Sequence, residues 1–151
     1  MAEQVEPYDL VLGFPLRWEP NAPHALFLSD DEGRVALAQV AHPDDPDQRC
    51  VVLVWDDAIF AEMTPPNDEA RHLHRLYDAG LRDVMWVGIV RDSALATQLR
   101  PMWAKVGERS ATPLHYVVLS KECVIEVLAM NVDCLRIPGA PREAALAIFL
   151  S

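Results

Sequence analysis

The stretch that decides the fold is RVALAQVAHPDDPDQRCVVLVW, residues 34–55, in which two apolar segments flank a run of proline and aspartate. Such segments favour β-strands, and aspartate and proline between them are typical of a turn. DDEG joins the first strand to a preceding segment, HALFLS at residues 24–29, and its Gly33 can supply the positive φ of a short hairpin. We therefore expect an antiparallel meander over residues 24–57, with its third strand central because that strand is apolar on both faces.

Two further segments change to the helical period. TPPNDEARHLHRLYDAG, residues 64–80, spaces its apolar residues for one helix face, begins with prolines and ends on Gly80. This spacing predicts a helix of about three turns. SALATQLRPMWAKVG predicts a second helix that starts at residue 92 or 93 and ends at residue 107, with Pro101 expected to kink or divide it.

The remaining apolar segments complete the expected fold. Strands are predicted at residues 8–14, 84–90, 114–120 and 123–137, and the tail at 142–150 can be a helix or an edge strand. The order of strands and helices between residues 50 and 120 favours some parallel pairing. The sequence thus predicts an α+β fold with a single mixed, largely antiparallel sheet of 6–8 strands covered by two main helices. Residues 1–151 have the length of a single domain and contain no linker.

The charge of the chain is uneven. The net charge is −10, and residues 1–70 hold 15 acids and three bases, whereas residues 71–151 hold eight acids and ten bases. An acidic surface repels phosphate backbones, so we expect no nucleic-acid partner. A basic protein partner, or self-association of the acidic half with the other half, fits this charge better.

The expected location of the protein, and the expectation of no cofactor, follow from sequence features that are missing. The apolar runs are of strand length, below the ~20 residues that cross a bilayer, so no membrane association is expected. MAEQVEPYD carries acids where a secretory signal carries bases, which favours a cytoplasmic location. Glycine-rich phosphate loops are missing, so we expect no cofactor. Eleven of the 13 bases are arginine, which together with abundant alanine and proline indicates a GC-rich bacterial genome.

AHPDD, residues 41–45, resembles the zinc-binding opening motif of the GlcNAc-phosphatidylinositol de-N-acetylase and LmbE-like deacetylases. The resemblance implies a zinc ion held by His42 and Asp45, with Asp44 as the base that takes a proton from zinc-bound water. The chain departs from that family at Pro46, where the family has glutamate and then a helix. We therefore predict a turn here and no metal site, and keep a metal-dependent hydrolase using these three residues as an alternative.

Polar residues at the start of the first predicted helix form the main candidate for ligand or partner binding. They are Asn67, Asp68, Glu69, Arg71 and His72. Polar groups between a strand end and a helix start can form a ligand site, although acids in a first turn can also simply complement the helix dipole. A further candidate is Trp18 in a proline-rich loop, either as an exposed anchor for a partner or as a residue packed on the sheet.

The sequence contains no complete catalytic set that we recognise, so we assign no catalytic residue and favour a binding protein over an enzyme. The leading hypothesis is a protein-interaction or regulatory module, of the immunity or inhibitor type, with an acidic N-terminal half. The alternatives are the metal-dependent hydrolase at His42, Asp44 and Asp45, and a small-ligand-binding domain with a pocket near residues 67–72.

Overall fold

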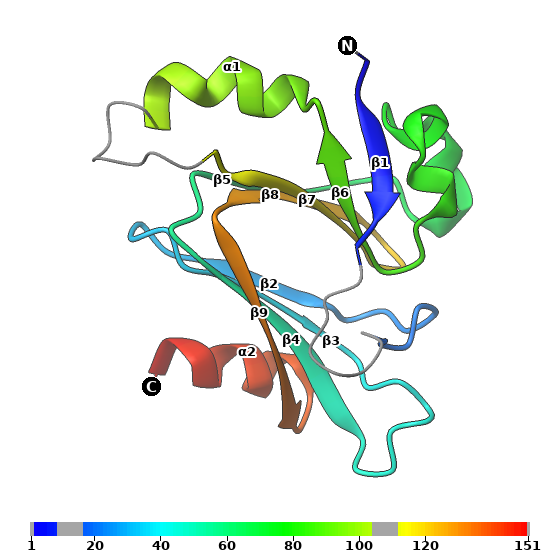
Figure 1. Ribbon diagram of the computed structural model, residues 1–151. Coiled ribbons are helices and arrows are strands. Elements are labelled where there is room, and N and C mark those ends of the chain that lie inside the picture. The colour runs from blue at the N-terminus through cyan, green and yellow to red at the C-terminus, as the bar shows by residue number, and fades with distance from the viewer. Residues whose placement is uncertain (1, 9–16, 104–111, 151) are drawn as a thin grey trace.

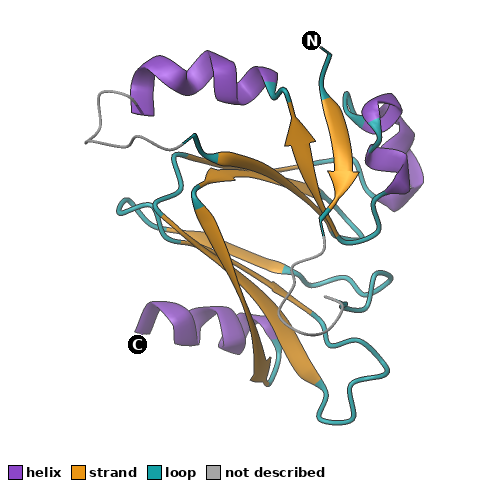
Figure 2. Cartoon of the chain, in the orientation of Figure 1, coloured by secondary structure: helices purple, strands orange, loops and turns teal. Residues whose placement is uncertain are grey.

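The computed structural model describes residues 2–8, 17–103 and 112–150, which form two facing β-sheets with a helical layer outside each sheet (Figures 1 and 2). The five-stranded sheet has the order β1-β6-β7-β8-β5 and the four-stranded sheet the order β2-β3-β4-β9. The strands are β1 (Gln4–Pro7), β2 (Leu26–Ser29), β3 (Val35–Gln39), β4 (Arg49–Asp56), β5 (Phe60–Thr64), β6 (Val87–Arg91), β7 (Leu114–Leu119), β8 (Val124–Ala129) and β9 (Asn131–Pro138).

The main core lies between the two sheets. Leu37 and Leu53 project into it from the four-stranded sheet, and Ile125 projects from the opposite one; all three are fully buried. The rings of Trp55 and Tyr116 pack there edge to face, with centroids 5.9 Å apart. Because alternate residues of a strand point to opposite faces, the remaining strand residues face outward toward the helices. Polar or ionisable side chains on the outer faces of the sheets are therefore separated from this core.

The predicted meander is confirmed. β2, β3 and β4 pair antiparallel in chain order, with Leu37 facing both Phe27 and Leu53. Gly33 has φ +85° in the turn between β2 and β3, as the turn sequence predicted. The α+β class is also confirmed, since helices and antiparallel sheets both occur.

The prediction of one mixed sheet is corrected to two antiparallel sheets. The segment 123–137 was expected to be one strand, but it divides at Met130, so that β8 pairs with β7 and β9 pairs with β4 in the other sheet. The parallel pairing is also wrong, because every strand pair of the described residues is antiparallel. Val87 faces Val118 and Ile89 faces Tyr116, so the chain between β6 and β7 leaves and re-enters the sheet at the same end.

The helix predicted over residues 64–80 is instead a series of 3₁₀ turns, η1 (Asp68–Leu73), η2 (Tyr77–Ala79) and η3 (Leu81–Asp83). His74 is extended after the first turn, and its Nδ1 accepts the N–H of Leu76, a local bond that competes with helical hydrogen bonding. Leu76 is thereby buried under the five-stranded sheet, while Leu73 remains 75% exposed. A tertiary contact has overridden the helical period.

Two α-helices cover the outer faces, α1 (Ala94–Trp103) and α2 (Pro141–Leu150). α1 contains Pro101 as predicted, and the rest of that predicted helix, 104–107, lies outside the described residues, as do residues 9–14 of the predicted first strand. The tail is a helix, the first of its two predicted alternatives. None of the described helices is long and apolar enough to cross a membrane.

Candidate functional site

Two polar side chains interrupt the outer face of the five-stranded sheet. His115 of β7 and Glu126 of β8 have the same orientation as the apolar residues Val117 and Val124, which lie under the 3₁₀ turns. His115 is 1% and Glu126 7% exposed. Buried polar groups are costly unless they are hydrogen-bonded, so their partners define what this face can do.

Ser93 supplies the partner of His115 on one side. β6 ends at Arg91, Asp92 turns the chain with φ +53°, and Ser93 then precedes the first residue of α1. The Oγ of Ser93 lies 2.6 Å from Nδ1 of His115 and also accepts the N–H of Ala96 at 3.0 Å. Ser93 is thus both the N-cap of α1 and the neighbour of a buried imidazole.

Glu126 supplies the partner on the other side. Its Oε1 lies 2.9 Å from Nε2 of His115, and the guanidinium of Arg75 bonds both carboxylate oxygens, at 2.7 and 2.9 Å. His74 approaches the same carboxylate at 3.6 Å. Burial alone would raise the pKa of Glu126, but the hydrogen bonds from His115, His74 and Arg75 outweigh burial and hold that pKa well below its usual range.

These contacts fix the roles of the two imidazole nitrogens. An ionised Glu126 only accepts hydrogen bonds, so Nε2 of His115 carries the hydrogen. In the neutral imidazole Nδ1 is then the acceptor, and the hydroxyl of Ser93 donates to it. The result is a hydroxyl, a base and an orienting carboxylate connected in sequence, which is the arrangement that nucleophilic catalysis by serine requires.

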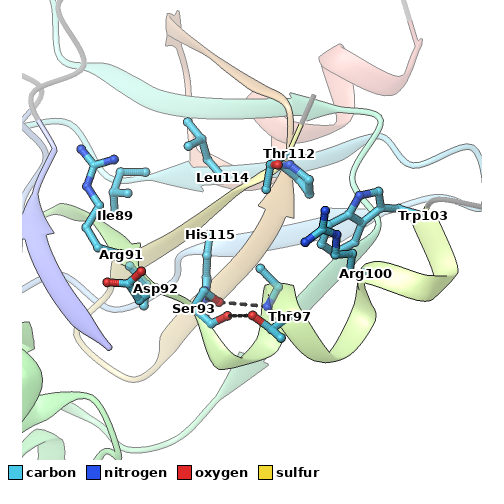
Figure 3. Close-up of a pocket in the computed structure, with 13 residues that line it drawn as sticks. Ile89, Arg91, Asp92, Ser93, Thr97, Arg100, Trp103, Thr112, Leu114 and His115 are labelled. Carbon is cyan, nitrogen blue, oxygen red and sulfur yellow. Dashed lines mark hydrogen bonds between the residues drawn. The ribbon is translucent and has the colours of Figure 1, made fainter. Parts of the chain in front are cut away.

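A cavity of about 250 Å³ gives access to this arrangement (Figure 3). Ser93 and His115 lie in its wall, between Arg91 and Asp92 at one side and Arg100 and Trp103 at the other. The other lining residues that Figure 3 labels are Ile89, Thr97, Thr112 and Leu114. A small molecule in this cavity would lie beside Ser93, whose hydroxyl contacts the fully buried imidazole of His115.

The predicted 67–72 cluster is divided between a helix cap and a different cavity. Asn67 accepts the N–H of Ala70 and caps the first 3₁₀ turn. Asp68 and Arg71 line a cavity of about 440 Å³, where Arg71 donates to the carbonyl of Ser120 and burial lowers its pKa. Glu69 and His72 are exposed. The structure therefore brings two of the five predicted residues together at a cavity.

The other predicted site residue, Trp18, is fully buried and belongs to the main core. Its ring meets that of Trp86 edge to face at 6.5 Å, and its carbonyl accepts the indole N–H of Trp86. The loop is therefore packed on the sheet, and the role of an exposed anchor does not suit this residue.

The AHPDD segment forms the predicted turn between β3 and β4. Side-chain and backbone hydrogen bonds from Arg49 lower the pKa of Asp45 to about 2 and occupy both of its carboxylate oxygens. Nδ1 of His42 accepts the N–H of Asp44. Within residues 2–8, 17–103 and 112–150, no three His, Cys, Asp or Glu side chains are grouped so that they could hold a metal ion.

The sequence predictions missed Ser93, His115, Glu126 and Arg75 as a group. One signal was available, since LHYVVL contains one histidine and VIEVLA one glutamate among mostly apolar neighbours. Buried ionisable residues are uncommon and need partners. Which partners they have depends on strand register, and Arg75 lies 51 residues from Glu126 along the chain.

Comparison with known proteins found no similar protein. No protein family matches this chain, and neither a characterised protein nor a solved structure is significantly similar to it.

Proposed function

We propose that this protein is a serine hydrolase that cleaves small acyl esters. The observation that carries the proposal is the continuous contact from the hydroxyl of Ser93 through the imidazole of His115 to the carboxylate of Glu126, at the wall of a cavity. Both hydrogen-bond distances lie within the range expected for a nucleophile, its base and the group that orients the base.

In the proposed reaction, the oxygen of Ser93 bonds to the ester carbonyl carbon while its proton moves to Nδ1 of His115. The imidazolium then gives this proton to the leaving alcohol as the C–O bond breaks, which leaves an acyl-serine. A water molecule, deprotonated by the same nitrogen, attacks the acyl carbon. The C–O bond to Ser93 then breaks, the imidazolium returns the proton to the oxygen of Ser93, and the carboxylic acid is released. Glu126 accepts the Nε2 hydrogen throughout and stabilises the positive charge on the ring.

Two further groups support these steps. The N–H of Ala96 donates to Oγ of Ser93 and, with the positive end of the α1 dipole, favours transfer of the hydroxyl proton to His115. Arg75 contacts only Glu126 within this chain of groups, so it acts as a positioning residue that keeps the carboxylate ionised and oriented.

The direct test is covalent labelling of the full chain with diisopropyl fluorophosphate, followed by intact-mass measurement and peptide mapping. One adduct on Ser93 is expected. Ser93→Asn retains an N-cap acceptor but is not a nucleophile, so this variant should fold and lose the adduct. His115→Gln should slow labelling by about 10²-fold or more, because the base is lost.

Ser29→Ala is the matched control, since Ser29 is exposed on β2 and distant from the site, and its labelling should equal that of the wild type. Absence of any adduct on Ser93, or an unchanged rate in a folded His115→Gln variant, would contradict the proposed function. Circular dichroism of each variant establishes that it is folded.

A second candidate function, binding of a basic protein partner, is favoured by the positions of the acids. Asp30, Asp31 and Glu32 are exposed in the turn between β2 and β3, and Asp44 and Asp47 are exposed in the turn between β3 and β4. Capture of a basic partner at low salt, lost at high salt and in charge-reversed variants of one turn, would support it. Light scattering would detect self-association, and the absence of any partner at low salt would exclude this candidate.

A further inference from the structure

The cavity beside Ser93 has one strongly cationic end. Ser93, Thr97 and Arg100 follow one another on a single face of the α1 segment and all line the cavity. Seven residues separate Ser93 from Arg100, a rise of about 10 Å along a helix. Because helical side chains lean toward the helix N-terminus, the guanidinium of Arg100 is directed back toward the serine.

The charges around the cavity differ in how they are compensated. Arg91 is paired with Glu6 at 3.2 Å, and Asp92 lies beside it at the same side of the cavity (Figure 3). Arg100 lies at the other side and forms no ion pair with any residue in the described parts of the chain. The charges of the cavity that have no ion-pair partner among residues 2–8, 17–103 and 112–150 are therefore a negative one at Asp92 and a positive one at Arg100, on opposite sides, so an anionic group of a ligand fits at the Arg100 side.

The neighbourhood of Arg100 also limits the size and shape of a ligand. Trp103 is 6% exposed and gives that end an apolar wall. Thr97 and Thr112 add hydroxyls. A volume of about 250 Å³ is below that of most ligand sites and therefore restricts the ligand to a short one, and a planar guanidinium matches the two oxygens of a carboxylate.

We infer that the substrate of the proposed hydrolase is a short acyl ester whose acyl chain ends in a carboxylate, with that carboxylate bound by Arg100 and the ester carbonyl at Ser93. This inference rests on the proposed function. Arg100 is a specificity residue in it: the guanidinium touches the far end of the substrate, and the bonds that form and break remain those at Ser93 and His115.

The test compares two esters of equal chain length, mono-p-nitrophenyl glutarate and p-nitrophenyl valerate, which differ by a terminal carboxylate in place of a methyl group. The wild type should have the higher kcat/KM for the glutarate. Arg100→Met should lower the glutarate-to-valerate ratio about tenfold, since a charge-assisted bond at a solvated position is lost. Arg100→Lys should retain part of the preference, because its charge remains but its planar donor geometry is lost.

Arg142→Met is the matched control, because it removes the same charge from an exposed position on α2, at the other sheet. Its ratio should equal that of the wild type. The wild-type preference should also decrease between 0.05 and 0.5 M salt, as expected for a partly screened ion pair.

The two failures are distinguishable. If neither ester is hydrolysed and diisopropyl fluorophosphate does not label Ser93, the proposed function fails and the inference fails with it. If Ser93 hydrolyses both esters and Arg100→Met leaves the ratio unchanged, only the inference about the substrate is overturned. An equal change in Arg142→Met would also overturn it, because the preference would then reflect net charge.

Discussion

The two α-helices cover opposite sides of the sandwich by different kinds of contact. α2 lies against the four-stranded sheet through Ala144 and Ala145, which meet the small residues Ala36 and Ala38 of β3. α1 begins on the five-stranded sheet at Ser93, whose contacts are polar and which lies beside a cavity of about 250 Å³. One helix is placed by close apolar packing, and the other by a hydrogen-bonded network.

This difference shows where the molecule has room for chemistry. Close apolar packing excludes ligands, whereas a polar network holds its members at fixed distances and can leave a space beside them. A network is also less tolerant of change, since removing one member leaves buried groups without partners. The following predictions separate the two kinds of contact.

The largest expected effect is that of Glu126→Leu. This change leaves the buried Nε2–H of His115 without its acceptor, which should cost up to about 3 kcal/mol, while the half-exposed guanidinium of Arg75 can be solvated by water. Urea unfolding followed by circular dichroism measures the loss. Glu62→Gln is the matched control, because Glu62 faces Glu126 on the neighbouring strand but is exposed, and it should change the free energy of unfolding by less than about 0.5 kcal/mol. Equal effects of the two changes would show that the network contributes little.

The apolar contact is tested by Ala145→Leu. Ala145 is fully buried between α2 and the sheet, so a larger side chain forces the helix away and should destabilise the protein by about 2 kcal/mol. Ala147→Leu on the exposed side of the same helix should have little effect. Thermal unfolding distinguishes them, and a neutral Ala145→Leu would mean that α2 is not closely packed.

Acid should act on the network and not on the apolar contact. The pKa of Glu126 is lower in the folded than in the unfolded state, where it is about 4.3, so its carboxylate stabilises the fold above that value and this contribution is lost as the pH falls below it. Below that pH, the free energy of unfolding should fall more steeply with decreasing pH in the wild type than in Glu126→Leu. The difference between these two acid slopes, measured by urea unfolding at several pH values, should reach up to about 1.4 kcal/mol per pH unit.

Asp45 contributes an acid slope of the same sign, because its pKa is lowered to about 2, and this slope should persist in Glu126→Leu and be absent in Asp45→Asn. Ala145→Leu should retain the wild-type slope. If the free energy of unfolding depends on pH in the same way in the wild type and in Glu126→Leu, the assignment of an ionised carboxylate to Glu126 is contradicted.

The smallest effect expected is that of Ser93→Ala, about 1 kcal/mol, from loss of the N-cap of α1. Ser93→Asn should recover most of this stability without recovering the nucleophile. If both variants are equally destabilised in thermal unfolding, the hydroxyl stabilises the fold mainly through His115 and not through the cap.

Local patterns predicted much of the fold. The β2–β3–β4 meander follows from short apolar segments separated by turn residues, which act over a few positions. The division at Met130 did not, because apolar residues continue on both sides of it and read as one strand. The turns over 68–83 also differed from the predicted helix, because His74 and Arg75 bond a strand far away in sequence.

The candidate site was less accessible to prediction than the fold. Its members come from the start of α1, from β7 and β8 and from the 3₁₀ segment, and their meeting depends on register and on which face each strand buries. The polar cluster at 67–72 was more conspicuous in the sequence than the one histidine within LHYVVL and the one glutamate within VIEVLA. Isolated ionisable residues in otherwise apolar strands are the more informative signal here.

The strand order has a consequence for how the molecule is made. β1 pairs with β6, so residues 4–7 cannot pair until residues 87–91 have been made. β4 likewise pairs with β9, so residues 49–56 need residues 131–138. Pairings so distant along the chain are slow to form, and folding should take milliseconds to seconds. During synthesis, the five-stranded sheet is complete only after residue 129 has left the ribosome and the four-stranded sheet only after residue 138, so the contacts of Ser93, His115 and Glu126 form only once β7 and β8 have both been made.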